Sequence, residues 1–200
     1  MTNRRDPASD PVTGSGVAMA DDKTGFAGTT THPERAITSL RVLKCGQGEQ
    51  HKEHRFGSRL PQLAWVFFGR SWVPVPLHCF LIAHRDGLVL FDTGIDPAIA
   101  TDKTYIRQAI GRFLLSRIFR LPLTETDRID YVLAKQGIAA SSIRTAVNSH
   151  LHFDHVGGIA QIPQAELLVS DREWAILSEP HPEREWILRE HIELPAARWR

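Results

Sequence analysis

Apolar and polar residues alternate in several short runs of the chain, and this period of two is typical of β-strands with one buried face. Between two of these runs, Arg85-Asp86-Gly87 predicts a tight hairpin turn, because an Asp-Gly pair readily adopts the positive φ angles of a two-residue loop. The polar segment from Gly46 to Pro61 predicts a loop. The pattern predicts strands over Ile37–Leu43, Leu77–His84, Leu88–Phe91, Ile143–Ser149 and Glu166–Val169.

Helical periodicity marks the segments between some of these strands. Apolar residues recur every three or four positions from Tyr105 to Leu121, which predicts an amphipathic helix. Its arginines are compatible with a membrane-surface helix but more typical of a helix that covers a core. A second helix is expected from a Thr126 cap to Gly137, and it would complete a right-handed βαβ unit. A capping box at Ser170–Glu173 and the segment Glu183–Ile192 predict two more helices.

The first 35 residues differ in composition from the rest of the chain. They are rich in Thr, Gly, Ser, Asp and Pro and carry few large apolar side chains, so they cannot bury enough surface to offset the entropy of ordering. We expect residues 1–35 to form a disordered leader, although a mis-assigned start codon would give the same pattern. Residues 36–200 have the length of one α/β domain in a chain of 22.5 kDa.

Charge and hydropathy restrict the partners. The chain has 24 Lys and Arg against 23 Asp and Glu, so we expect neither a nucleic acid nor a membrane as partner. No run approaches the ~18 apolar residues of a membrane span. The N-terminus lacks the apolar segment of a secretory signal, so a cytoplasmic location is expected. Cys45 and Cys79 are too few for a disulfide framework and are expected to pack as small apolar residues in strands.

Three histidines and one aspartate lie within six residues, at His150, His152, Asp154 and His155. Imidazole nitrogens and carboxylate oxygens are ligands of zinc. If the preceding strand reaches His152, then His150 and His152 share one face, and the following turn lets Asp154 and His155 project together. The sequence therefore predicts two adjacent ligand pairs. The alternative is a histidine-rich turn that is satisfied by hydrogen bonds, or an incidental metal-binding tract.

Two glycines follow this motif directly, at positions 157 and 158. Because glycine has no Cβ, the backbone there is expected to bend tightly and to pass close to the metal.

The segment from Asn148 to Gly158 resembles the metal-binding signature of the metallo-β-lactamase-fold hydrolases, in wording closest to the N-acyl-homoserine lactonases. A second block, Pro74 to Gly94, is similar to the family's two-strand hairpin that ends in Asp-Thr-Gly. The resemblance implies an αββα sandwich built from two similar halves. It also implies that Asp92 steadies the ligand loop; the alternative is a turn aspartate that bonds its own backbone.

The resemblance further implies a reaction. Two zinc ions would share a hydroxide and polarise a substrate carbonyl, and Asp154 would bind one ion and orient the nucleophile. The substrate would be a small lactone, ester, thioester or amide. Hydrolysis of acyl-homoserine lactones would make the protein a quorum-quenching enzyme.

The chain departs from the family pattern downstream of the motif, where 45 residues remain. A full member supplies a third histidine for the first metal, a bridging aspartate and a final histidine, whereas Asp171, His181 and His191 lie in other contexts. We therefore expect a C-terminally truncated member that holds the first half of the sandwich. The alternatives are an inactive fragment with at most weak metal binding, and a half-domain that forms a homodimer or acts as a regulatory module.

Overall fold

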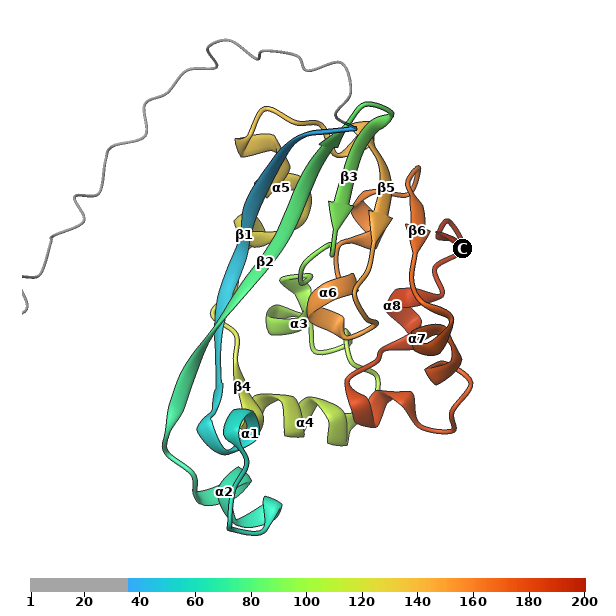
Figure 1. The fold of residues 1–200 in the computed structure, drawn as a ribbon. Helices are drawn as coiled ribbons and strands as arrows, with labels where there is room; N and C mark the ends of the chain where they lie inside the picture. Colours follow the sequence, from blue (N-terminus) through green and yellow to red (C-terminus); the bar gives the residue numbers. More distant parts are fainter. Residues whose placement is uncertain (1–35) are drawn as a thin grey trace, which may run out of the picture. The chain divides into compact units, whose positions relative to one another are not determined.

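The computed structural model describes residues 36–200, and the expectation of a disordered leader over residues 1–35 lies outside this range. The described residues form one mixed sheet in the order β4-β1-β2-β3-β5-β6-β7 (Figure 1). Its strands are β1 (Ile37–His51), β2 (Trp72–His84), β3 (Gly87–Phe91), β4 (Phe119–Arg120), β5 (Ile143–Val147), β6 (Glu166–Leu168) and β7 (Arg198–Trp199).

The helices of the described chain are short. The α-helices are α1 (Lys52–Phe56), α2 (Gln62–Phe68), α3 (Ala98–Thr101), α4 (Ala109–Ile118), α5 (Ile129–Lys135), α6 (Phe153–Val156), α7 (Asp171–Ile176) and α8 (Arg189–Ile192). Single turns of 3-10 helix span Glu125–Asp127, Ala140–Ser142, Ile159–Gln161 and Pro182–Glu185. Within residues 36–200, no helix has both the length and the apolar character needed to cross a membrane.

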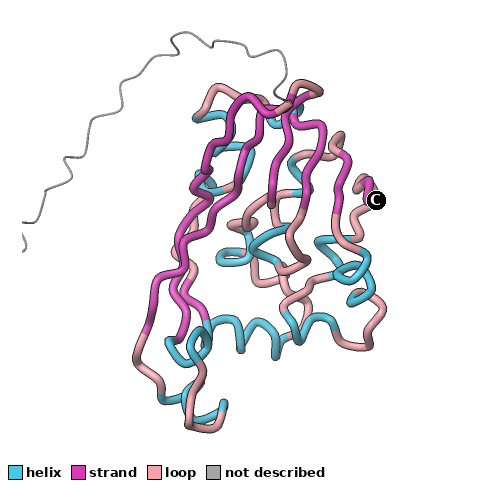
Figure 2. The backbone as a smooth tube through the Cα atoms, in the orientation of Figure 1, coloured by secondary structure: helices cyan, strands magenta, loops and turns pink. Residues whose placement is uncertain are grey.

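β1 and β2 form an antiparallel pair that is longer than predicted. β1 continues to His51 and α1 follows it directly, so the loop expected from Gly46 to Pro61 is wrong over most of its length. The register shifts between Lys44 and Gln47 at Gly46, whose φ is +110°, and this irregularity lets the pairing resume beyond it. Figure 2 shows the two strands running together toward the end of the molecule where α1, α2 and α4 lie.

The remainder of the sheet follows the predicted order. The tight turn between β2 and β3 is confirmed, and Gly87 has the positive φ that the turn requires. β3 pairs in parallel with β5, and α5 lies between them in the sequence, so the βαβ unit is present. β6 continues the parallel part as expected. β7 was not predicted, because two residues carry too little periodicity to be recognised.

Three helix boundaries differ from the prediction. α4 is shorter than Tyr105–Leu121 at both ends. Thr126 caps no helix; Thr124 forms a capping box with Asp127 instead, and α5 begins only at Ile129. The helix expected over Glu183–Ile192 is divided in two, because Trp186 adopts a left-handed φ of +62°. The Ser170 cap is confirmed, since its hydroxyl accepts a hydrogen bond from the Glu173 backbone N–H.

The main core lies on one face of the sheet. Leu81, Leu90 and Ala146 point into it from neighbouring strands, and α5 contributes Ile129 and Leu133. Their strand neighbours alternate to the opposite face, where Val42, Phe80 and Phe91 lie side by side in register and are exposed. Cys45 and Cys79 are buried in β1 and β2 as free thiols, with their sulfurs 3.4 Å apart. One layer of helices on one sheet is therefore the architecture of residues 36–200.

Candidate metal centre

The histidine motif begins just after β5, in the middle of the sheet. The strand ends at Val147, so the expected extension to His152 is wrong. It ends there because the backbone N–H of Ser149 donates to Oδ1 of Asp92 (2.7 Å) instead of continuing the ladder. The chain then runs irregularly to His152 and enters the single turn of α6.

The expected alternation of side chains is present without the strand. Leu151 and Phe153 are buried, whereas His150 and His152 are only half-buried. The ring centroids of His150 and His152 are 4.4 Å apart, and those of His150 and His155 are 3.9 Å apart. The three imidazoles that the sequence singled out are thus brought together.

Asp154 and His155 form the second pair, and both lie on α6. Oδ2 of Asp154 is 3.6 Å from Nε2 of His155. The other ring nitrogen of His155, Nδ1, is 2.8 Å from Oδ2 of Asp92. This hydrogen bond assigns the proton to Nδ1, because the carboxylate is an acceptor, and it leaves Nε2 directed toward Asp154.

Asp92 links the end of β3 to the motif. It is buried and has a φ of +60°, a conformation that is strained for a residue with a Cβ. Its carboxylate accepts hydrogen bonds from the backbone N–H and the hydroxyl of Ser149 and from the ring of His155. The turn aspartate that bonds its own backbone does not describe these contacts. Asp92 therefore contacts the motif segment at both of its ends.

The three histidines differ in their ionisation. Burial lowers the pKa of His150, and the positive charges of His155 and His152 lower it further. Burial also lowers the pKa of His152, although Asp154 opposes the shift. For His155, burial is outweighed by the Asp92 hydrogen bond and by the charges of Asp154 and Asp92, so its pKa is raised. His150 and His152 are therefore neutral at pH 7 and keep lone pairs for a metal.

The pKa of Asp92 is shifted by the same hydrogen bonds. Burial favours the protonated carboxyl, but the hydrogen bonds from His155 and Ser149 outweigh burial and lower the pKa of Asp92. The buried group is consequently an anion at neutral pH, and it faces the one histidine of the motif whose pKa is raised.

Gly157 and Gly158 serve close packing rather than a tight turn around a metal. Neither has a positive φ. A Cβ on Gly157 would lie 2.3 Å from the backbone N of Asp96, and one on Gly158 would lie 2.2 Å from the carbonyl oxygen of Thr93. The two glycines thus let the end of α6 lie directly against the loop that follows β3.

Three residues near the motif were not singled out by sequence analysis. Ser149 bonds Asp92, as described above. The hydroxyl of Thr93 donates to the carbonyl of His155 (3.0 Å) and accepts from the backbone N–H of Gly158 (3.2 Å). Glu173 of α7 accepts from the backbone N–H of Leu151 at 3.3 Å. The first two stand inside the quoted sequence blocks, whereas nothing local marks Glu173.

The polar residues downstream of the motif have partners elsewhere, as the sequence context suggested. His191 stacks on Tyr105, with ring centroids 3.8 Å apart, and its Nε2 lies 2.7 Å from the Tyr105 carbonyl oxygen. His181 is 3.1 Å from Glu183, and Asp171 is the first residue of α7. These contacts leave His150, His152, Asp154 and His155 as the donors that the described chain gathers at the motif.

The chemistry of these four donors fits a zinc-like ion, but their arrangement does not enclose one. Neutral imidazoles and a carboxylate are the donors that such ions accept. Within residues 36–200, however, no three His, Cys, Asp or Glu side chains already adopt the geometry of a metal site. Each pair supplies two protein ligands, whereas catalytic zinc ordinarily has three.

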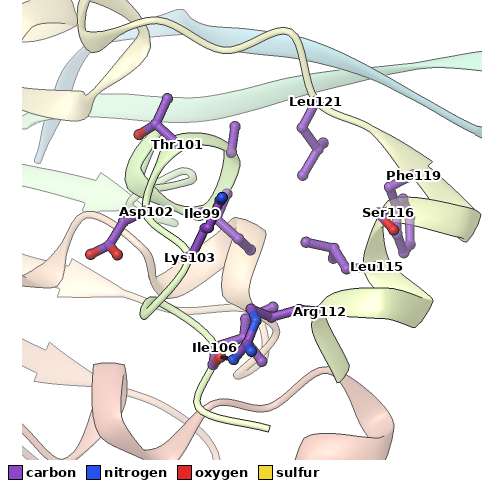
Figure 3. A pocket seen from close by; sticks show the side chains of 11 residues that line it. Ile99, Thr101, Asp102, Lys103, Ile106, Arg112, Leu115, Ser116, Phe119 and Leu121 are labelled. Atoms are coloured by element: carbon purple, nitrogen blue, oxygen red, sulfur yellow. Dashed lines mark hydrogen bonds between the residues drawn. The ribbon is translucent and has the colours of Figure 1, made fainter. Parts of the chain in front are cut away.

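A hollow reaches the motif from the side of β1 and β2. A small cavity of about 20 Å³ is lined by Asp154 and by apolar residues that include Leu77, Phe119 and Leu121. Phe119 and Leu121 also line a larger cavity of about 390 Å³, shown in Figure 3. Ile99, Leu115 and Leu121 project into this larger cavity, and Lys103 and Arg112 lie at its border.

Comparison with known proteins shows the family to which this chain belongs. Residues 72–199 match the model of the metallo-beta-lactamase superfamily, and the chain belongs to that superfamily. The chain is 31% identical over 101 residues to the N-acyl homoserine lactonase AiiA of Bacillus thuringiensis subsp. kurstaki, a match that covers 50% of this chain and 38% of that protein. The match to an N-acyl homoserine lactonase of Bacillus cereus is 30% identical over the same length.

Solved structures share the fold. A B. thuringiensis AiiA variant with bound N-decanoyl-L-homoserine superposes with a TM-score of 0.63 at 20% identity, covering 83% of this chain and 60% of that one. The same values hold for an N-acyl homoserine lactone hydrolase with N-hexanoyl-L-homoserine at its catalytic metal centre. The chain therefore spans less than half the length of these curated relatives in the sequence match and about 60% of these structures.

Proposed function

We propose that this protein is a zinc-dependent hydrolase of lactones or related esters, with N-acyl-homoserine lactones as the first substrate class to test. The observation that carries the proposal is the convergence of three imidazoles and Asp154 beside a buried Asp92 that holds Nδ1 of His155. The named lactonases among the relatives favour a lactone over other carbonyl substrates.

The four motif residues would hold the metal. His150 and His152 would bind one ion, and Asp154 with Nε2 of His155 would bind the second. When bound, such ions make water a nucleophile at neutral pH and polarise a carbonyl. Asp92 would fix the tautomer and the ring orientation of His155, which is the support that metal-binding histidines generally need. Asp154 would also orient the attacking water, because its side chain is 26% exposed and lines the small hollow.

The cavities beside Asp154 suit an apolar substrate chain. Phe119 and Leu121 line both the small hollow at Asp154 and the larger cavity, whose wall includes Ile99, Ile106 and Leu115. An acyl chain placed there would bury apolar surface at about 25 cal/mol per Å². The carbonyl of the same substrate would then lie toward the motif. The size and lining of the cavity support a substrate with an acyl group. The choice of a lactone as the reacting group is supported only by the similarity to known lactonases.

The test is hydrolysis of N-hexanoyl-homoserine lactone by the full chain loaded with zinc, followed as acid release. We expect turnover, loss of at least 100-fold in kcat/KM for His152→Ala, and little change for His181→Ala, which removes an exposed histidine outside the motif. Zinc content is measured on the same samples. Background zinc together with equal turnover in the wild type and His152→Ala would reject the proposal.

A second candidate is a chain that binds one ion weakly and turns over little. It is favoured by the absence of a preformed three-ligand site within residues 36–200. In this case zinc would be removed by a mild chelator, and the lactone would remain intact. Tight binding of two ions per chain would contradict the second candidate and support the first.

A further inference from the structure

The basic residues of the chain are concentrated in two segments that are distant in sequence. Lys52–Trp72 and Lys103–Leu121 together contain nine Lys and Arg and a single carboxylate, Glu53. Because the whole chain has 24 Lys and Arg against 23 Asp and Glu, the remaining residues are net acidic. A net charge of +1 therefore conceals a strong segregation of charge. We call these two segments the basic apolar end.

The two segments form one surface. α2 and α4 pack through a small core of Trp65, Val66 and Ile118. The rings of Phe67 and Phe113 are 6.0 Å apart, and Arg117 donates to the carbonyl of Phe67 at 2.8 Å. Figure 1 shows α1, α2 and α4 together at the end of the molecule that β1 and β2 reach.

This surface also exposes large apolar side chains. Phe68 is 82% exposed, and Phe56 and Leu63 are each 69% exposed. The other exposed apolar residues of the same segments are Leu60, Phe67, Ile110 and Phe113. Scattered single residues of this kind need no explanation, but a group on three adjoining helices marks an interaction surface.

A cationic hollow of about 450 Å³ opens in the same surface. Its lining includes Arg70, Arg117, Arg120, His51, Trp72 and Ser116, and no carboxylate contributes to it. The guanidinium of Arg120 lies 3.9 Å from the ring centroid of Trp72. Arg120 is also paired with Glu49 at 3.4 Å, and Arg117 bonds the carbonyl of Phe67. The guanidinium of Arg70 adds a further positive charge to the hollow, which can accept an oxyanion such as a phosphate.

The basic charge and the exposed apolar side chains together indicate which kind of partner this surface binds. A second copy of the chain would bring two strongly basic surfaces together, so self-association through this surface is opposed by charge. A folded acidic protein would satisfy the arginines but has no general need for so many exposed aromatic side chains. A bilayer with anionic headgroups satisfies both, because basic residues bind the headgroups and apolar side chains enter the acyl boundary.

We propose that the basic apolar end docks on membranes that contain anionic phospholipid, with a headgroup phosphate in the arginine-lined hollow and Phe68 and Leu63 at the acyl boundary. This binding would not require metal or lactone hydrolysis, because the hollow and the apolar group contain none of the four motif residues. Amphipathic acyl substrates concentrate at the membrane interface. Docking there would therefore raise the substrate concentration near the cavity of Figure 3.

The experiment is co-sedimentation of the metal-free full chain with vesicles of phosphatidylcholine, with and without phosphatidylglycerol. We expect binding only to the phosphatidylglycerol vesicles, weakening as salt is raised. Arg70→Glu reverses one charge and should weaken the partition about 25-fold, since each basic residue near such a surface contributes about 5-fold. Phe68→Ser should weaken the partition by about 10-fold or more.

Matched controls use the opposite end of β1 and β2. Leu40→Ser removes an apolar residue of similar exposure (62%), and Arg85→Glu reverses an exposed charge, and neither should change binding. Circular dichroism verifies that all variants are folded. Equal binding to both vesicle types, or equal loss in the control variants, would overturn the proposal.

Free phosphate and self-association are separate outcomes. If inorganic phosphate raises the melting temperature of the wild type but not of Arg70→Glu, and vesicles do not bind, then the hollow takes a soluble anion and the docking proposal is wrong. If light scattering shows dimers that Phe68→Ser dissociates, and vesicles again do not bind, the surface is an interface between copies, which also overturns the proposal.

Discussion

The motif region and the basic apolar end use polar groups in opposite ways. Around the motif, Asp92 bonds Ser149 and His155, and the imidazoles lie against one another over a buried layer of Leu151 and Phe153. At the basic apolar end, cations outnumber carboxylates, and aromatic side chains such as Phe68 face solvent.

Most polar groups of the motif region have partners within the described residues, although the side-chain amide of the buried Asn148 has none. At the basic apolar end, Arg117 bonds the Phe67 carbonyl and Arg120 pairs with Glu49, but the large apolar side chains remain exposed within the described residues. The first region therefore has the character of a site, and the second that of a surface.

The largest predicted contrast is between two phenylalanines. Phe153 is buried in a second core cluster with Leu77 and Ile95, and its ring makes edge contacts with Phe119 and Trp186. Phe153→Ala should lower the free energy of unfolding by about 3–5 kcal/mol, because it leaves a cavity. Phe68→Ala should change it by less than about 0.5 kcal/mol. Urea denaturation measures both, and comparable losses would show that α2 is packed as firmly as the motif.

The second contrast is between two glycines. Gly158→Ala should cost about 2–3 kcal/mol, because its Cβ would meet the carbonyl oxygen of Thr93 at 2.2 Å and Ile129 at 2.6 Å. Gly111 of α4 meets only the methyl group of Ile106 at 3.2 Å and a more distant Gln108. Gly111→Ala should therefore range from neutral to a gain of about 1 kcal/mol from helix propensity. A neutral Gly158→Ala in thermal denaturation would contradict the close approach of α6 to the β3 loop.

The third prediction concerns Asp92. Asp92→Asn should reduce zinc affinity about 10- to 100-fold, because the amide cannot hold Nδ1–H of His155 as the carboxylate does. Competition with a zinc indicator measures this change. The control is Asp102→Asn, an exposed aspartate that bonds only Thr104 in the described structure, and zinc affinity should be unchanged in it. An equal affinity in Asp92→Asn would show that the buried carboxylate serves the fold alone.

The sequence predicted the parts of this molecule that depend on local chemistry. The strand alternation, the Asp86-Gly87 turn, the Ser170 cap and the pairing of Asp154 with His155 all follow from neighbouring residues. Asp92 came from the resemblance, and its predicted contact with the ligand loop is present.

The remaining features depend on contacts between distant residues. β1 continues past Gly46 because β2 is there to pair with it, and β5 stops at Val147 because the side chain of Asp92 takes the N–H of Ser149. Gly158 is required by Thr93, which lies more than sixty positions away. The concentration of basic residues at one end of the molecule was not recognised from the sequence, for a related reason. The overall count of charges gave near-neutrality, and only the packing of α2 on α4 brings the two basic segments together.

The smallest predicted effect compares a paired charge, Arg128, with Arg70, which has no ion-pair partner among residues 36–200. Arg128 makes two hydrogen bonds to Asp130, at 2.8 and 3.0 Å, and these bonds lower the pKa of Asp130 although its partial burial opposes the shift. The pair therefore stabilises the fold above the unfolded pKa of about 3.8, and this contribution disappears as the pH falls through the lowered folded value. Asp130→Asn should cost about 0.5 kcal/mol at pH 7 and nothing at pH ~2, as measured by urea denaturation at both pH values. Arg70→Gln at the basic apolar end should show no such dependence, and a loss for Arg70→Gln that follows the same pH profile would mean that its charge is already paired within the chain.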